Sequence, residues 1–206
     1  VSFYNETKDF AVYPSPVIGM VGELENIENR MTMHFKDPGD FILLLGSLSG
    51  SLGGSEYLKT IHGKIEGPLA SYDIDYEMAV QNLCLKLIEQ GIVKSAHDVS
   101  DGGLSVNIAE SILHATNENV GAKINIESKL REDELLFGEC QSMIIVTINE
   151  KDLLSTISAA KDLNVHTQTI GRVTNDKTLS INDFISIDRN ELGSGYFNYY
   201  SNLLAD

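Results

Sequence analysis

The sequence is poor in the residues that build disulfide frameworks. It has two cysteines and no tryptophan among 206 residues. Cys84 and Cys140 lie in apolar or mixed segments without a CxxC spacing, a pattern that fits a reducing compartment better than a set of disulfides. We therefore expect both to be buried, small apolar side chains.

Basic residues are also scarce, with 15 lysines and arginines against 30 aspartates and glutamates, a formal net charge of −15. Proteins that bind nucleic acids or anionic membranes displace counterions with basic side chains, so this balance argues against both as partners. No apolar run approaches the ~20 residues that a membrane-spanning helix needs, and no signal-peptide pattern is visible. We expect a cytoplasmic protein. A nucleotide is not excluded, because it needs only local positive groups or backbone amides.

The length indicates one large domain, or one domain with part of another. Hydrophobic residues make up 42% and charged residues 22%, which is ordinary globular composition. The chain begins with Val1 instead of methionine, and its first segment is typical of the middle of a protein. We therefore expect a fragment of a longer protein.

Apolar periodicity predicts helices that alternate with strands. Helices are expected over 75–90, 104–115, 150–163 and 191–204, and strands over 17–21, 41–46, 95–99, 121–126, 142–148, 167–173 and 177–187. Residues 23–30 are expected to be a linker or short helix, and 47–56 a serine- and glycine-rich connection. Because the order lacks a strict parallel βαβ rhythm, the sequence favours an α+β fold, a mixed β-sheet covered by helices.

The helix over 75–90 has the clearest signals. Its buried face is expected to hold Val80, Leu83, Cys84, Leu87 and Ile88. Asp73 or Asp75 can cap its start, and Gly91 stands where a left-handed C-terminal cap would be. In the helix over 150–163, Asn149 is expected as the cap, with Leu153, Leu154 and Ile157 pointing inward.

Glycines and carboxylates mark two candidate sites. Residues 50–55 (GSLGGS) can form an anion-binding nest, although they lack the ending of a P-loop; the alternative is a flexible connection. Farther on, Asp98 and Asp101 follow a strand and precede Gly102-Gly103, so they can hold Mg²⁺ beside a helix N-terminus that can meet a phosphate. The alternative is that Asp101 only caps the helix. His97 is expected to be structural.

Two further polar segments are candidates. Glu139 and Gln141 stand just before a strand, where a ligand can be met; the alternative is a polar lip on the sheet edge. Cys140 is not expected to be a nucleophile, because the adjacent Glu139 would raise its pKa. Residues 1–7 (VSFYNET) can bind sugar hydroxyls or phosphate, or form a surface loop.

Four ordered motifs resemble the second half of the synthetase subunit of the phosphoribosylformylglycinamidine synthases. They are VSFYNET at 1–7 with PSPVIGMVG at 14–22, GGSEY at 53–57, AHDVSDGGL at 96–104 followed by Ala109-Glu110, and GECQS at 138–142. The resemblance spans residues 1 to about 145. It implies that residues 1–30 are the tail of the second ATP-fold domain, and that 31–206 form the second C-terminal domain of the aminoimidazole ribonucleotide (AIR) synthetase type.

The resemblance also implies a reaction and partners. The family converts formylglycinamide ribonucleotide to the amidine in purine biosynthesis, using ATP, Mg²⁺ and ammonia. ATP phosphorylates the amide oxygen and ammonia displaces the phosphate, chemistry that depends on positioning and on neutralising phosphate charge. The implied partners are the rest of the synthetase chain, a glutaminase subunit that supplies ammonia and a small accessory subunit.

The resemblance assigns site residues one by one. Ser2 matches a substrate-contacting serine, and no catalytic residue is expected in this chain, because the family's catalytic histidine and ATP lysine lie in the first half. Asp98, Asp101, Glu139 and Gln141 are expected to face an auxiliary, non-catalytic nucleotide or metal site. The usual Glu-Ser-Gln of the first half is Glu-Cys-Gln here.

Two alternatives remain at this point. One is another member of the AIR synthetase superfamily, such as AIR synthetase itself, selenophosphate synthetase or a hydrogenase maturation factor, although these carry different residues at 98–104. The other is a non-catalytic domain that serves only as a scaffold and subunit contact. Saturable binding of Mg-ATP or Mg-ADP separates a nucleotide site from a scaffold.

Overall fold

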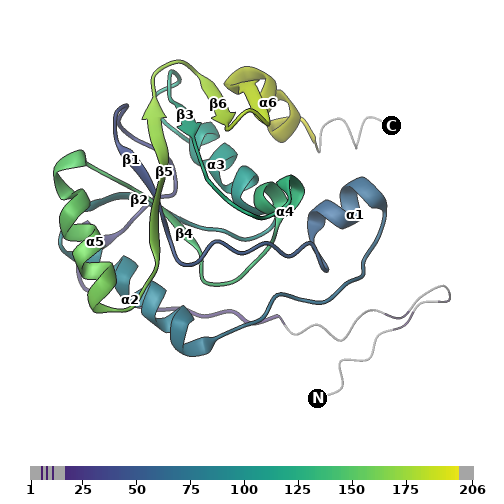
Figure 1. The fold of residues 1–206 in the computed structure, drawn as a ribbon, viewed down its shortest axis with the longest axis horizontal. Coiled ribbons are helices and arrows are strands. Elements are labelled where there is room, and N and C mark those ends of the chain that lie inside the picture. Colours follow the sequence, from purple (N-terminus) through teal and green to yellow (C-terminus); the bar gives the residue numbers. More distant parts are fainter. Residues whose placement is uncertain (1–5, 7, 9–10, 12–16, 200–206) are drawn as a thin grey trace.

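The fold is a seven-stranded mixed sheet with helices on both faces (Figure 1). It was obtained as a computed structural model, which describes residues 6, 8, 11 and 17–199. The strands are β1 (Phe41–Leu45), β2 (Val93–Asp98), β3 (Gly121–Ile124), β4 (Ile144–Ile148), β5 (Thr167–Thr174), β6 (Thr178–Ile181) and β7 (Ile185–Asp188). Their spatial order is β2-β4-β1-β5-β3-β6-β7. β3 and β6 pair in parallel and the other neighbours are antiparallel, so the predicted α+β fold with a mixed sheet is confirmed.

The helices form two layers. They are α1 (Glu56–His62), α2 (Ile74–Glu89), α3 (Gly103–Leu113), α4 (Glu132–Phe137), α5 (Leu153–Asp162) and α6 (Arg189–Phe197), with 3₁₀ turns at Ile27–Asn29 and Glu150–Asp152. α3, α4 and α6 pack on one face of the sheet, and α2 and α5 on the other. Each layer therefore has its own apolar core.

Strand β1 contributes to both cores, because successive side chains of a strand point to opposite faces. Ile42 and Leu44 belong to the core under α3, whereas Leu43 and Leu45 belong to the core under α2. All four are fully buried. A continuous apolar run in the sequence thus becomes a central strand that is covered on both sides.

Helix α2 forms as its sequence signals predict. The Asp73 carboxylate accepts hydrogen bonds from the backbone N–H groups of Asp75 and Tyr76 and so caps the helix start. Gly91 follows the helix end with a φ of +68°. Four of the five predicted face residues are buried, and Ile88 is partly buried against the same core.

Four predictions of local structure are wrong. The segment 17–21 is not a buried strand: Val17 and Met20 are 99% and 91% exposed, and none of the strand pairs of the described residues includes them. The segment 177–187 is two strands, because Asn182 takes a left-handed conformation in a tight turn between β6 and β7. Helices α1 and α4, of seven and six residues, were not predicted, since each is too short for its periodicity to stand out.

The fourth wrong prediction is that Leu154 in α5 points inward. Leu154 is 81% exposed, whereas the residues of α5 that are buried are Thr156, Ala159 and Ala160. Leu154 lies on the side of α5 opposite Thr156 and Ala159 and so faces away from the sheet, although the neighbouring Leu153 is partly buried against the core. The sequence pattern hides the true face because Thr156 is polar; its hydroxyl donates to the Asp152 carbonyl, 2.8 Å away, and is thereby satisfied inside.

A partly buried ion pair ties the start of β1 to β2. Lys94 Nζ lies 2.7 Å from Asp40 Oδ1 and 2.8 Å from Asp37 Oδ2, and Asp40 is 4% exposed. Burial raises the pKa of the Asp40 carboxyl above its usual value, and the hydrogen bond from Lys94 opposes that rise. Removing Lys94 would leave a buried carboxylate without its cation.

Lys94→Ala is therefore expected to lower the free energy of unfolding by about 2–3 kcal/mol at neutral pH. In the variant, the pKa of Asp40 in the folded state would rise further above its pKa in the unfolded chain. The loss of stability is therefore small below the unfolded-state pKa of Asp40, and it grows as the pH rises through its folded-state pKa. Urea titrations between acid and neutral pH measure this slope. The exposed Lys151→Ala is the control, and a pH-independent loss in Lys94→Ala would contradict the prediction.

Two expectations from the sequence concern membrane-spanning helices and the state of the two cysteines. None of the helices in the described part of the chain is long and apolar enough to cross a bilayer. Cys84 and Cys140 are both free and buried, and burial raises the pKa of the Cys84 thiol to about 11. Cys84 therefore stays protonated near neutral pH and packs as an apolar side chain.

Candidate functional site

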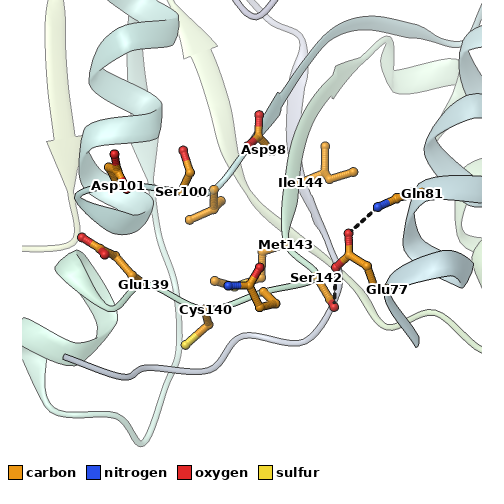
Figure 2. Close-up of a pocket in the computed structure, with 12 residues that line it drawn as sticks. Glu77, Gln81, Asp98, Ser100, Asp101, Glu139, Cys140, Ser142, Met143 and Ile144 are labelled. Atoms are coloured by element: carbon orange, nitrogen blue, oxygen red, sulfur yellow. Dashed lines mark hydrogen bonds between the residues drawn. The ribbon is translucent and has the colours of Figure 1, made fainter. Parts of the chain in front are cut away.

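A pocket of about 440 Å³ lies where the end of β2, the start of β4 and the first turns of α2 meet (Figure 2). Asp98 ends β2, and Asp101 follows it in the turn before α3. Glu139 and Gln141 come from the segment that leads into β4. Residues from three sequence segments thus line one cavity. The pocket has one edge on α2, through Glu77 and Gln81.

The structure brings together all four residues that were predicted for an auxiliary site. Asp98, Asp101, Glu139 and Gln141 all line this pocket. The side chains of Asp98 and Asp101 are exposed, so their carboxylates can meet a ligand. Ser2, the predicted substrate contact, lies outside the described residues, and its assignment stays a prediction.

Glu139 has a different role from its three companions. Its Oε1 accepts hydrogen bonds from two backbone N–H groups, those of Glu56 at 2.9 Å and Gly102 at 2.8 Å. Its own N–H donates to the Ser51 carbonyl at 2.9 Å. The carboxylate therefore joins the start of α1 to the turn before α3, where unpaired N–H groups otherwise need a partner. Glu139 holds the pocket wall together, and one of its oxygens is committed to that task.

The glycines around the pocket allow three loops to pack backbone against backbone. A Cβ on Gly50 would lie 2.8 Å from the Glu134 carbonyl oxygen, and one on Gly103 would lie 2.7 Å from the Phe137 carbonyl carbon. A Cβ on Gly138 would lie 2.8 Å from the Gly50 Cα. This close packing argues against a flexible connection at residues 50–55, while the predicted anion nest stays a prediction.

Asp101 does not cap α3, and that alternative is wrong. The N-cap residue is Gly102, which makes no side-chain hydrogen bond, and both Gly102 and Gly103 have φ values near +75°, at +79° and +70°. Two successive left-handed residues turn the chain sharply before the helix. The N–H of Gly102 is satisfied by Glu139 instead, which leaves Asp101 facing solvent at the pocket.

The sequence reasoning missed a polar group on the α2 side of the pocket. Glu77 accepts hydrogen bonds from Gln81 Nε2 at 2.6 Å and from the Ser142 hydroxyl at 2.7 Å (Figure 2). Ser142 has a φ of +61°, an uncommon conformation for a residue with a side chain. The (i, i+4) spacing of Glu77 and Gln81 was a visible signal, but it is also typical of an ordinary solvated helix face.

The pocket is acidic. Of its twelve lining residues, four are carboxylic acids and none is lysine, arginine or histidine. In the described part of the chain, no group of three or more His, Cys, Asp or Glu side chains is placed to hold a metal ion. Asp98 and Asp101 nevertheless suit Mg²⁺, which takes one or two protein carboxylates together with phosphate oxygens and water. His97 contacts Ser111 and Glu110, as expected of a structural residue.

Comparisons with known proteins identify the family to which this domain belongs. Residues 37–183 match the family described as "AIR synthase related protein, C-terminal domain". The chain is 39% identical, over 183 residues, to phosphoribosylformylglycinamidine synthase subunit PurL of Alkaliphilus metalliredigens, a match that covers 88% of this chain and 24% of that protein. The chain thus spans about a quarter of the length of the curated relatives it matches.

Solved structures of Thermotoga maritima PurL share the fold. The complex with FGAR aligns with a TM-score of 0.67 at 16% identity, over 81% of this chain and 30% of that one. The PurLQS structure aligns with a TM-score of 0.64 at 19% identity, over 81% and 28%. The same T. maritima protein has been solved with ATP. Because the family match covers most of its length, this chain belongs to the AIR synthase related proteins, of which it carries the C-terminal domain.

Proposed function

We propose that this chain is the C-terminal portion of a phosphoribosylformylglycinamidine synthase. The whole enzyme would join ammonia to formylglycinamide ribonucleotide at the expense of ATP, in the cytoplasm. The observation that carries the proposal is the 39% identity to a PurL protein along 88% of this chain. Residues 1–30 would belong to a preceding ATP-fold domain and 31–206 to the C-terminal domain. The T. maritima structure is one of PurLQS, which supports partners beyond the synthetase chain; these would be a glutaminase subunit and a small accessory subunit.

The chain's own contribution would be an auxiliary nucleotide pocket. Asp98 and Asp101 are exposed at its rim and would hold Mg²⁺ that is shared with nucleotide phosphates. The ion would offset the repulsion between the phosphates and the four carboxylates of the pocket. Gln141, which is exposed, can donate and accept hydrogen bonds to a nucleotide. Glu139 would act as a positioning residue, because its Oε1 is bound to backbone N–H groups.

The reaction itself would take place elsewhere in the longer polypeptide. None of the pocket residues is a histidine or lysine that could serve as base or phosphate clamp. Ser2 would be the one residue of this chain that contacts the substrate. The chain of 206 residues should therefore be inactive alone.

Asp98→Ala in the longer synthetase tests the proposal. Turnover is expected to stay within about twofold of the unaltered enzyme, while binding of Mg-ADP to the auxiliary pocket weakens about tenfold or more, since a metal carboxylate is lost. Amidine formation and isothermal titration measure the two effects, with the exposed Asp183→Ala as control. The 206-residue chain, assayed beside them, should give no product. Turnover by that chain, or none by the longer polypeptide, would contradict the proposed function.

A further inference from the structure

Apolar side chains that should be buried lie exposed along the connection from α1 to α2 and along α2 itself. We call them the apolar patch; they are Ile65, Leu69, Tyr72, Ile74, Met78 and Leu85, each between 52% and 81% exposed. Soluble monomers rarely expose large apolar patches without a binding role. Figure 1 shows the connection as a long extended stretch at the margin of the domain.

Within α2 the patch follows a helical stripe. Ile74, Met78 and Leu85 are spaced by four and seven residues and so share one side of the helix. The opposite side carries Val80, Leu83, Cys84 and Leu87, which pack on the sheet. Helix α2 is therefore apolar on two sides, as expected of a helix that lies between two packed layers.

The acidic charge of the adjacent pocket indicates what kind of surface would cover the apolar patch. Glu77 and Gln81 lie on α2 between patch residues and line the acidic pocket. A covering surface would bring its own charges close to four carboxylates, so a surface with basic residues is complementary. A second copy of this chain, with its net charge of −15, would bring more negative charge. A second copy is therefore disfavoured.

The course of the polypeptide indicates which domain would cover the apolar patch. Thr32 accepts a hydrogen bond from the Ala96 N–H of β2, so the polypeptide enters the domain along the strand on which α2 packs. The preceding segment 17–27 also carries exposed apolar side chains, with Val21 at 103% and Ile27 at 64%. Relatives carry about three quarters of their length outside the match. A domain tethered through this short segment would reach the patch at high effective concentration.

We propose that the apolar patch is the docking surface for the domain that precedes this one in the longer polypeptide, a surface with apolar anchors and basic residues opposite the pocket. This inference rests on the proposed function, because it requires a longer chain. Docking would also close the α2 side of the pocket, and it would supply the positive charge that the pocket lacks.

Hydroxyl-radical footprinting of the 206-residue chain and of the longer polypeptide tests the docking. Leu69 on the patch and Leu154 on α5 are matched, since both are leucines 81% exposed. In the longer polypeptide, modification of Leu69, Tyr72 and Met78 is expected to fall about fivefold or more, as at a packed interface, with Leu154 unchanged. Met78→Lys should restore modification of Leu69, whereas Leu154→Lys should not.

Three outcomes would overturn the docking. Leu69 and Leu154 could be modified equally in both proteins, which would leave the patch uncovered. The 206-residue chain could protect Leu69 as its concentration rises, which would make a second copy the occupant. Met78→Lys could leave Leu69 protected, which would separate the protection from the patch. The amidine assay is independent: protection without activity would reject the proposed function and keep the docking, and activity without protection would do the reverse.

Discussion

Gly103→Ala is expected to destabilise the domain by about 3–4 kcal/mol, a large fraction of the total stability of a typical domain. The residue has a φ of +70°, where an alanine costs about 1–2 kcal/mol. The added Cβ would also lie 2.7 Å from the Phe137 carbonyl carbon and 2.8 Å from the Gly138 carbonyl oxygen. Both are backbone atoms, so no flexible side chain can yield, and overpacking of this kind costs about 1–3 kcal/mol more.

Gly91→Ala is the matched control for this variant. Gly91 has almost the same φ, +68°, but no atom lies within 4 Å of the Cβ that would be added. Gly91→Ala should therefore show only the backbone cost of about 1–2 kcal/mol. Urea denaturation of both variants gives the difference between them. Equal losses would mean that the three loops at the pocket are not packed as tightly as the structure indicates.

Glu139→Ala is expected to cost about 3 kcal/mol, because two backbone N–H groups, of Glu56 and Gly102, would lose their shared acceptor. Glu139→Gln should keep most of the stability, since an amide oxygen can still accept both bonds. The unfolding free energies of the two variants measure the contrast. Hydrogen exchange should quicken at the start of α1 in Glu139→Ala only.

The same pair of variants separates positioning from ligand binding. If Glu139 acts only through Glu56 and Gly102, Glu139→Gln should bind Mg-ADP nearly as well as the unaltered protein. A direct metal ligand would instead lose affinity in Glu139→Gln at unchanged stability. Weak nucleotide binding in a stable Glu139→Gln variant would thus contradict the positioning role, while equal stability losses in both variants would contradict the hydrogen bonds.

Much of the fold could be predicted from the sequence where one signal dominates. The uninterrupted run at 41–46 predicted a buried strand, and the candidate caps, Asp73 or Asp75 at the start and Gly91 at the end, predicted the bounds of α2 to within a residue. The predictions failed where the decisive partner is distant in sequence. Leu154 is exposed because the sheet selects Thr156 and Ala159, and nothing local marks that choice. Tertiary packing decides which side of α5 faces the sheet.

The candidate site shows the same division. Ordered motifs predicted that Asp98, Asp101 and Gln141 face one ligand site, and the structure places them around one pocket. The role of Glu139 could not be predicted, because its two hydrogen-bond donors are 83 and 37 residues away in the chain. In the sequence, a carboxylate just before a strand suggests a ligand contact. Only the folded chain shows that the Glu139 carboxylate already accepts hydrogen bonds from two backbone N–H groups.

The dual role of β1 has a consequence for how the domain unfolds. Ile42 and Leu44 face one core, and Leu43 and Leu45 face the other. A slip of β1 by one residue would exchange all four side chains between the cores. The two helical layers thus depend on the same pairing of β1 with β4 and β5. Loss of either layer would expose two of the four β1 side chains to water, which couples the stability of the two layers.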